Sequence, residues 1–142
     1  MIRQATLQDH RAIFALARAQ AKATYPELKE DVARMSNALR EVLSNSAHFA
    51  WVAEDGEVKG ALLALTNDNL WAQRKHSQIV LWHSDLPGEG LRLLLQYRKW
   101  VESQRAIRFA GLAPGAPVSP DVFRVAEAAG FKAASEARLF YN

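Results

Sequence analysis

The chain has 142 residues, 49% of them hydrophobic and 23% charged, which is typical of one globular domain with a substantial core. It carries 18 lysine and arginine residues against 15 acidic ones, so its formal net charge is +3. The lack of cysteine excludes disulfides, thiolate nucleophiles and cysteine metal ligands. No apolar run reaches the roughly 18 residues that a membrane-spanning helix needs, and the first residues lack the pattern of a signal peptide. We therefore expect a cytoplasmic protein that forms a single domain over residues 1–142, with no contact to a membrane.

Hydrophobic periodicity and turn residues divide the chain into ten predicted elements. In chain order they are a strand at 2–6, helices at 7–22 and 28–43, strands at 49–54, 58–66 and 78–83, a helix at 91–104, a strand at 107–112, a helix from 119 to about 129, and a closing strand or bent pair of strands at 131–141. The order β-α-α-β-β-β-α-β-α-β is neither regular βαβ alternation nor all-β. It predicts an α/β fold in which a mixed sheet carries helices on both faces.

Local signals support several of these boundaries. Thr6 and Asp9 have the spacing of a capping box at the start of the first helix. Asp55-Gly56 is a strong hairpin signal, and Gly60 inside the returning strand predicts a bulge or a close backbone approach. The run 79–82 is apolar on both faces, which is typical of a central strand covered on both sides.

Three motifs follow one another at a characteristic spacing. The first is the hairpin Trp51-Val52-Ala53-Glu54-Asp55-Gly56-Glu57-Val58-Lys59-Gly60, the second a strand, glycine loop and helix over 79–104, and the third the ending Ala126-Glu127-Ala128-Ala129-Gly130-Phe131. In this order they resemble the GCN5-related N-acetyltransferase (GNAT) superfamily over essentially the whole chain. The resemblance implies the GNAT fold, with a mostly antiparallel central sheet and helices on both faces, and acyl transfer from acetyl-CoA.

The resemblance also implies where coenzyme A would bind. GNAT proteins hold its pyrophosphate in a loop of pattern Q/R-x-x-G-x-G/A at a helix N-terminus, where glycines permit close approach and free N–H groups face the anion. The strand before the loop contacts the pantetheine arm through its backbone. The residues that these roles assign here are Ile79, Leu81, Leu86, Gly88, Glu89, Gly90, Leu91, Arg92 and Ser119.

The loop departs from the family pattern at three positions. Asp85 stands where the pattern has Gln or Arg, Pro87 removes one N–H donor, and Glu89 adds a carboxylate near the anion. Arg92 in the first helical turn could offset these charges. A simple helix-starting turn, with acidic residues that suit the helix dipole, would explain the same residues without coenzyme A.

Acetyl transfer to an amine needs a base, a donor to the oxyanion and an acid for the leaving thiolate. Ala126 occupies the position where many GNAT enzymes carry a tyrosine as that acid, and Ser119 replaces a frequent asparagine. His83 at the end of the central strand is a candidate base, because imidazole exchanges protons near neutral pH. Tyr141 on the last strand is a second candidate. A surface histidine and a packed tyrosine are the structural alternatives.

Other features yield weaker predictions. Trp71 and the polar residues 73–76 could contact an acceptor, or could form a loop held by one buried tryptophan. No spacing of His, Asp and Glu suits a metal site, so none is expected. The basic residues are scattered, the nearest approach to a patch being Arg92, Arg98, Lys99 and Arg105 along one predicted helix. Nucleic acid is therefore not expected as a partner.

Three functional readings remain open. The leading one is acetyl-CoA-dependent N-acetyl transfer to an amine of a small molecule or a protein. The second is a GNAT-fold protein that has lost catalysis and serves as a binding or assembly module, which the altered loop and Ala126 favour. The third and weakest is an acyltransferase-like protein that acts on nucleic acid. The resemblance is also compatible with a homodimer and with a divergent bacterial or phage origin.

Overall fold

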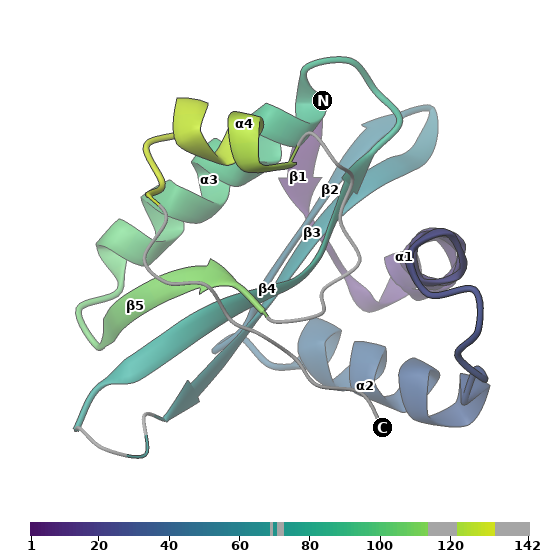
Figure 1. Ribbon diagram of the computed structural model, residues 1–142, viewed down its shortest axis with the longest axis horizontal. Helices are drawn as coiled ribbons and strands as arrows, with labels where there is room; N and C mark the ends of the chain where they lie inside the picture. Colours follow the sequence, from purple (N-terminus) through teal and green to yellow (C-terminus); the bar gives the residue numbers. More distant parts are fainter. Residues whose placement is uncertain (69, 71–72, 114–121, 133–142) are drawn as a thin grey trace.

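The computed structural model describes residues 1–68, 70, 73–113 and 122–132 (Figure 1). In chain order its elements are β1 (Ile2–Gln4), a short 3₁₀ turn η1 (Leu7–Asp9), α1 (His10–Thr24), α2 (Val32–Ser44), β2 (Phe49–Asp55), β3 (Glu57–Asp68), β4 (Lys75–Ser84), α3 (Glu89–Ser103), β5 (Ile107–Leu112) and α4 (Val122–Ala128). Among the described residues, no helix combines the length and hydrophobicity that crossing a membrane requires.

The strands of this part of the chain form one sheet in the order β1-β2-β3-β4-β5. The first three pairings are antiparallel, and only β4 and β5 run parallel. The predicted mixed, mostly antiparallel sheet is confirmed. The parallel pair requires the crossover that α3 supplies between the two strands.

Helices cover both faces of the sheet, as predicted (Figure 1). On one face α3 and α4 pack over a core in which Phe49, Leu62 and Tyr97 are almost fully buried. On the other face α1 and α2 pack over a second core that contains Ile13 and Val52, both with no exposed surface. The central strands β3 and β4 contribute to both cores, which explains why their sequences are nearly continuously apolar.

The capping box predicted at Thr6 starts the 3₁₀ turn η1, and α1 follows at His10 rather than at the predicted residue 7. The backbone N–H of Thr6 donates to a carboxylate oxygen of Asp9 at 2.8 Å. Asp9 is buried and also accepts two bonds from the guanidinium of Arg3, at 2.8 and 2.9 Å. Because Arg3 also donates to Glu54 on β2, this network ties the start of the first helix to the edge of the sheet.

Two further predicted boundaries were wrong by several residues. The second helix begins at Val32 rather than 28, because the side chain of Asp31 accepts the N–H of Arg34 at 3.0 Å and caps it there. The loop predicted at 67–76 is shorter, since β3 runs to Asp68 and β4 starts at Lys75. Residues 119–121, the start of the predicted fourth helix, and residues 133–141 of the predicted closing strand lie outside the described residues.

Candidate functional site

The candidate site lies where the parallel strands β4 and β5 separate. Their pairing ends at Ile79 and Leu112, where the N–H of Ala113 donates to the carbonyl of Ile79 at 2.9 Å. Beyond this point β4 continues for five more residues to Ser84, paired with β3 alone. Among the described residues, the edge of β4 that faces β5 therefore has no strand partner from Val80 to Ser84.

A β-bulge lies at the start of this open stretch. In the antiparallel pairing of β3 with β4, Leu63 faces Leu81 and Ala64 faces Ile79, so Val80 is an extra residue. A bulge turns the strand and redirects its backbone groups and side chains. Here Val80 and Leu81 both contribute to the core under α1 and α2, while Ile79 belongs to the core under α3.

The bulge also decides where His83 lies. The indole Nε1 of Trp82 donates to the carbonyl of Gly90 at 3.0 Å, so Trp82 faces α3. Because side chains alternate along a strand, His83 lies on the opposite face, beside Ala61 of β3. His83 thus lies within β4, one residue before the strand ends at Ser84.

The loop after β4 places the N-terminus of α3 at the same end of the sheet. Gly88 is the N-cap of α3 with φ of +76°, a conformation that favours glycine. The N–H of Glu89 donates to the carbonyl of Leu86 at 3.2 Å. The next two N–H groups, of Gly90 and Leu91, have no backbone partner within the described part of the chain. Such unpaired donors at the positive end of a helix dipole suit an anion.

Three contacts hold this loop against the sheet. The N–H of Asp85 donates to the carbonyl of Lys59 at 2.9 Å. The hydroxyl of Ser84 accepts the N–H of Leu86 at 3.1 Å. Gly60 permits the close approach of β3 to β4, since a Cβ there would lie 2.8 Å from the Ser84 hydroxyl oxygen. A bulge between β2 and β3 adjoins Gly60, so both predicted uses of this glycine are confirmed.

The two carboxylates that depart from the family pattern are both paired with cations or imidazole. Asp85 Oδ1 lies 2.8 Å from Nε2 of His83. Glu89 accepts from Arg92 at 2.8 Å, and its other oxygen lies 3.4 Å from the amino group of Met1. The bond from Arg92 and the nearby amino group lower the pKa of Glu89 against the effect of its burial. Arg92 is thereby engaged with Glu89, which limits its role as a free cation for an anion.

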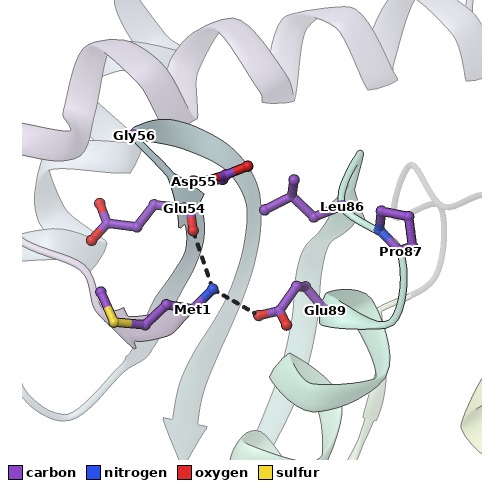
Figure 2. A pocket seen from close by; sticks show the side chains of 7 residues that line it. All are labelled: Met1, Glu54, Asp55, Gly56, Leu86, Pro87 and Glu89. Carbon is purple, nitrogen blue, oxygen red and sulfur yellow. Dashed lines mark hydrogen bonds and ion pairs between the residues drawn. The ribbon is translucent and has the colours of Figure 1, made fainter.

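A cavity of about 540 Å³ lies between the β2–β3 turn and this loop (Figure 2). Its lining residues are Met1, Glu54, Asp55, Gly56, Leu86, Pro87 and Glu89. Three of them are acidic, so the cavity does not suit a diphosphate. No sequence pattern predicted this cavity, because the hairpin and the loop are brought together only by the fold.

The remaining predicted site residues divide into two groups. Ser119, Tyr141 and the loop residue Trp71 lie outside the described residues. Ala126 packs against the core under α3, so the position of the usual tyrosine is filled by a small apolar side chain. Tyr97 is fully buried with its hydroxyl donating to Ser77 at 2.8 Å, and burial raises its pKa to about 12. Tyr97 is thus a core residue.

The structure also bears on the weaker predictions. No group of three His, Asp or Glu side chains able to hold a metal occurs in the described ranges. On α3, Arg98 pairs with Glu102 at 3.0 Å and donates to the carbonyl of Ala129. Since Arg92 is paired as well, and Arg105 lies beyond the end of α3, the basic helix that supported nucleic acid binding is largely neutralised.

The mostly antiparallel sheet and the glycine-started helix after β4 have the layout that the resemblance to GCN5-related N-acetyltransferases implies. No family model matches the sequence, and no curated protein matches it. Solved structures do match over the whole chain. A predicted acetyltransferase with acetyl-CoA from Clostridium acetobutylicum has a TM-score of 0.77 at 16% identity, covering 99% of this chain and 95% of that one.

Two further solved structures match similarly. A possible acetyltransferase from Clostridium difficile 630 has a TM-score of 0.75 at 13% identity, covering 100% of this chain and 96% of that one. A transcriptional regulator from Bacillus halodurans C-125 has a TM-score of 0.75 at 21% identity, covering 100% of this chain and 99% of that one. At such identities the likeness establishes the GNAT fold and leaves the substrate open.

Proposed function

We propose that the chain is an acetyl-CoA-dependent N-acetyltransferase that acetylates an amine of a small molecule or a protein. One observation carries the proposal: the open edge of β4 and the unpaired N–H groups at the start of α3 lie at the same end of the sheet. The edge could receive the pantetheine arm through its backbone, and the helix start could receive the pyrophosphate. Both are backbone sites, so they tolerate the unusual side chains of the loop.

The residues present fit acetyl-CoA in part. The space beside Gly88 is open, since a Cβ there would meet no atom within 4 Å, and Gly90 and Leu91 offer N–H groups. Asp85 and Glu89 are engaged by His83 and Arg92, which reduces their repulsion of an anion. The bound donor would supply the acetyl group and a thiol leaving group. We expect this reaction in the cytoplasm.

His83 is the proposed base for the acceptor amine. It lies on the open end of β4, on the face opposite α3, with 23% of its side chain exposed. An acceptor could therefore approach from the face that α1 and α2 cover, while the donor lies on the side of α3. Tyr141 remains a second predicted catalytic residue.

The test is calorimetric titration with acetyl-CoA of the wild type and of two matched variants, Gly88→Asn and Gly88→Asp. The two side chains have nearly the same shape and both tolerate positive φ, so they differ in charge and in the hydrogen bonds that the Asn amide can donate. A carboxylate close to the diphosphate should weaken binding by about 1–2 kcal/mol, or roughly 5–30-fold, relative to Asn. Equal affinities, or no binding to the wild type at millimolar acetyl-CoA, would contradict a donor site at this helix.

A binding or assembly module without catalysis is the second candidate. The packing of Ala126 where many GNAT enzymes carry a tyrosine favours it. Thiol release in an acceptor screen, compared between the wild type and His83→Ala, distinguishes the two. Binding of acetyl-CoA without turnover of any amine would favour the module.

A further inference from the structure

The contact between His83 and Asp85 has a defined direction. Nε2 of His83 lies 2.8 Å from Oδ1 of Asp85. An ionised carboxylate can only accept hydrogen bonds, so Nε2 must carry the proton. In the neutral imidazole the other nitrogen, Nδ1, then holds the lone pair. Within the described residues Nδ1 makes no hydrogen bond, and its lone pair can accept a proton.

The backbone that carries the carboxylate is fixed independently of this contact. The N–H of Asp85 is bound to the carbonyl of Lys59 at 2.9 Å, and the adjacent Ser84 and Leu86 are joined through the Ser84 hydroxyl. Although 61% of the Asp85 side chain is exposed, these hydrogen bonds fix the backbone at Asp85 and at the residues on either side of it. His83 is likewise held by the pairing of β4 with β3.

We propose that Asp85 is a positioning residue for His83. It holds the imidazole with its proton on Nε2 and directs the lone pair on Nδ1 toward the acceptor amine. The catalytic role of this pair rests on the proposed acetyl transfer, whereas the hydrogen bond between the two side chains stands independently of it. The inference also explains why an aspartate occupies a position where the family pattern has Gln or Arg: its carboxylate serves the imidazole rather than the diphosphate.

The step that this pair would assist is balanced as follows. The amine nitrogen bonds to the acyl carbon, and the carbon–sulfur bond breaks with its electron pair going to sulfur. The proton of the amine passes to Nδ1 of His83, and the resulting imidazolium is stabilised by Asp85. The thiolate takes up one proton from the imidazolium, which restores the neutral ring; if water supplies this proton instead, the imidazolium gives its own proton to the hydroxide that remains.

The geometry can be tested without any acetyl donor. Two-bond ¹⁵N–¹H correlation spectra of the labelled protein, recorded over a range of alkaline pH until they no longer change, show which ring nitrogen carries the proton. We expect a single form protonated on Nε2 in the wild type. In Asp85→Ala the two nitrogen shifts should move toward each other, because both forms become populated. Asp85→Asn should keep the wild-type pattern, since its amide oxygen still accepts from Nε2.

Kinetic measurements on the same variants distinguish the orientation of the imidazole from the effect of the Asp85 charge. With an acceptor identified, Asp85→Ala should lower kcat by roughly 10- to 100-fold, less than the loss of about 10²–10⁴ expected for His83→Ala. The KM for acetyl-CoA should stay within about twofold. Asp85→Asn should lower kcat although the nitrogen pattern is unchanged, because only the charge is lost. Glu57→Gln, which removes an exposed carboxylate of the neighbouring hairpin outside the cavity lining, is the control and should leave both readouts unchanged.

The outcomes distinguish this inference from the proposed function. A wild-type ring protonated on Nδ1, or a pattern that Asp85→Ala does not alter, would overturn the inference even in an active enzyme. A fixed Nε2 proton that depends on Asp85, in a protein that acetylates no amine, would support the positioning and reject the acetyl transfer.

Discussion

Replacing Gly60 with alanine should displace the end of β4. The new Cβ would lie 2.8 Å from the hydroxyl oxygen of Ser84, 2.9 Å from its Cβ and 3.0 Å from the carbonyl oxygen of His83. The serine cannot simply rotate away, because its hydroxyl is bound to Leu86 and its Cβ is equally close. The backbone must therefore move, and such overpacking costs about 1–3 kcal/mol.

Gly111→Ala is the matched control, since Gly111 also lies in a strand and a Cβ there meets no atom within 4 Å. Removing glycine freedom from the unfolded chain should make this variant neutral or up to about 1 kcal/mol more stable. Urea denaturation of both variants and the wild type measures the difference, with an unchanged slope as the condition for comparing midpoints. If Gly60→Ala were as stable as Gly111→Ala to within about 0.5 kcal/mol, the proposed close approach of the two strands would be wrong.

Two further predictions concern α3. Gly130→Ala should lower the free energy of unfolding by about 1–2 kcal/mol, because Gly130 has φ of +88° and a Cβ there would overlap the guanidinium of Arg98. In denaturant titrations, the double variant with Arg98→Ala should lose less stability than the sum of the two single variants. Burial raises the pKa of Tyr97 to about 12, so the folded state keeps this proton when the unfolded chain has lost it. Stability should therefore fall as pH rises from about 10 to 12, by up to about 1.4 kcal/mol per pH unit from this residue. Urea midpoints of Tyr97→Phe over the same pH range should lack that component; an identical pH dependence would contradict the assignment.

The order of elements followed from the sequence because each of its signals is local. The hairpin at Asp55-Gly56 and the apolar run at 79–82 are short-range patterns, and the structure confirms both. The start of the second helix was missed because a single cap, Asp31, outweighed the apolar periodicity that continued upstream. The ends of β3 and β4 were missed because polar residues such as Asn67 and His76 pair across the sheet although their side chains resemble a loop.

The site was less accessible to sequence reasoning. The bulge at Val80 depends on a count of residues between two strands, and no residue type marks it. The pairing of Asp85 with His83 was missed as well, since Asp85 was weighed only as a charge facing an anion. Their separation by two positions at the end of a strand was the available signal: such residues point to the same side of the chain.

The acidic loop therefore has a different meaning in the fold from the one it has in the sequence. Taken as isolated charges, Asp85 and Glu89 oppose an anion at the start of α3. In the structure each has a local partner, His83 for Asp85 and Arg92 for one oxygen of Glu89, while the N–H groups of Gly90 and Leu91 have no backbone partner among the described residues. Acetyl-CoA bound through backbone N–H groups depends on the geometry and dipole of the helix rather than on the loop side chains. The side chains of the loop can therefore differ from the family pattern, and Asp85 can serve His83 instead. On this argument the affinity for acetyl-CoA should respond more strongly to substitution of Gly88 than to substitution of Asp85, whereas turnover should respond to both.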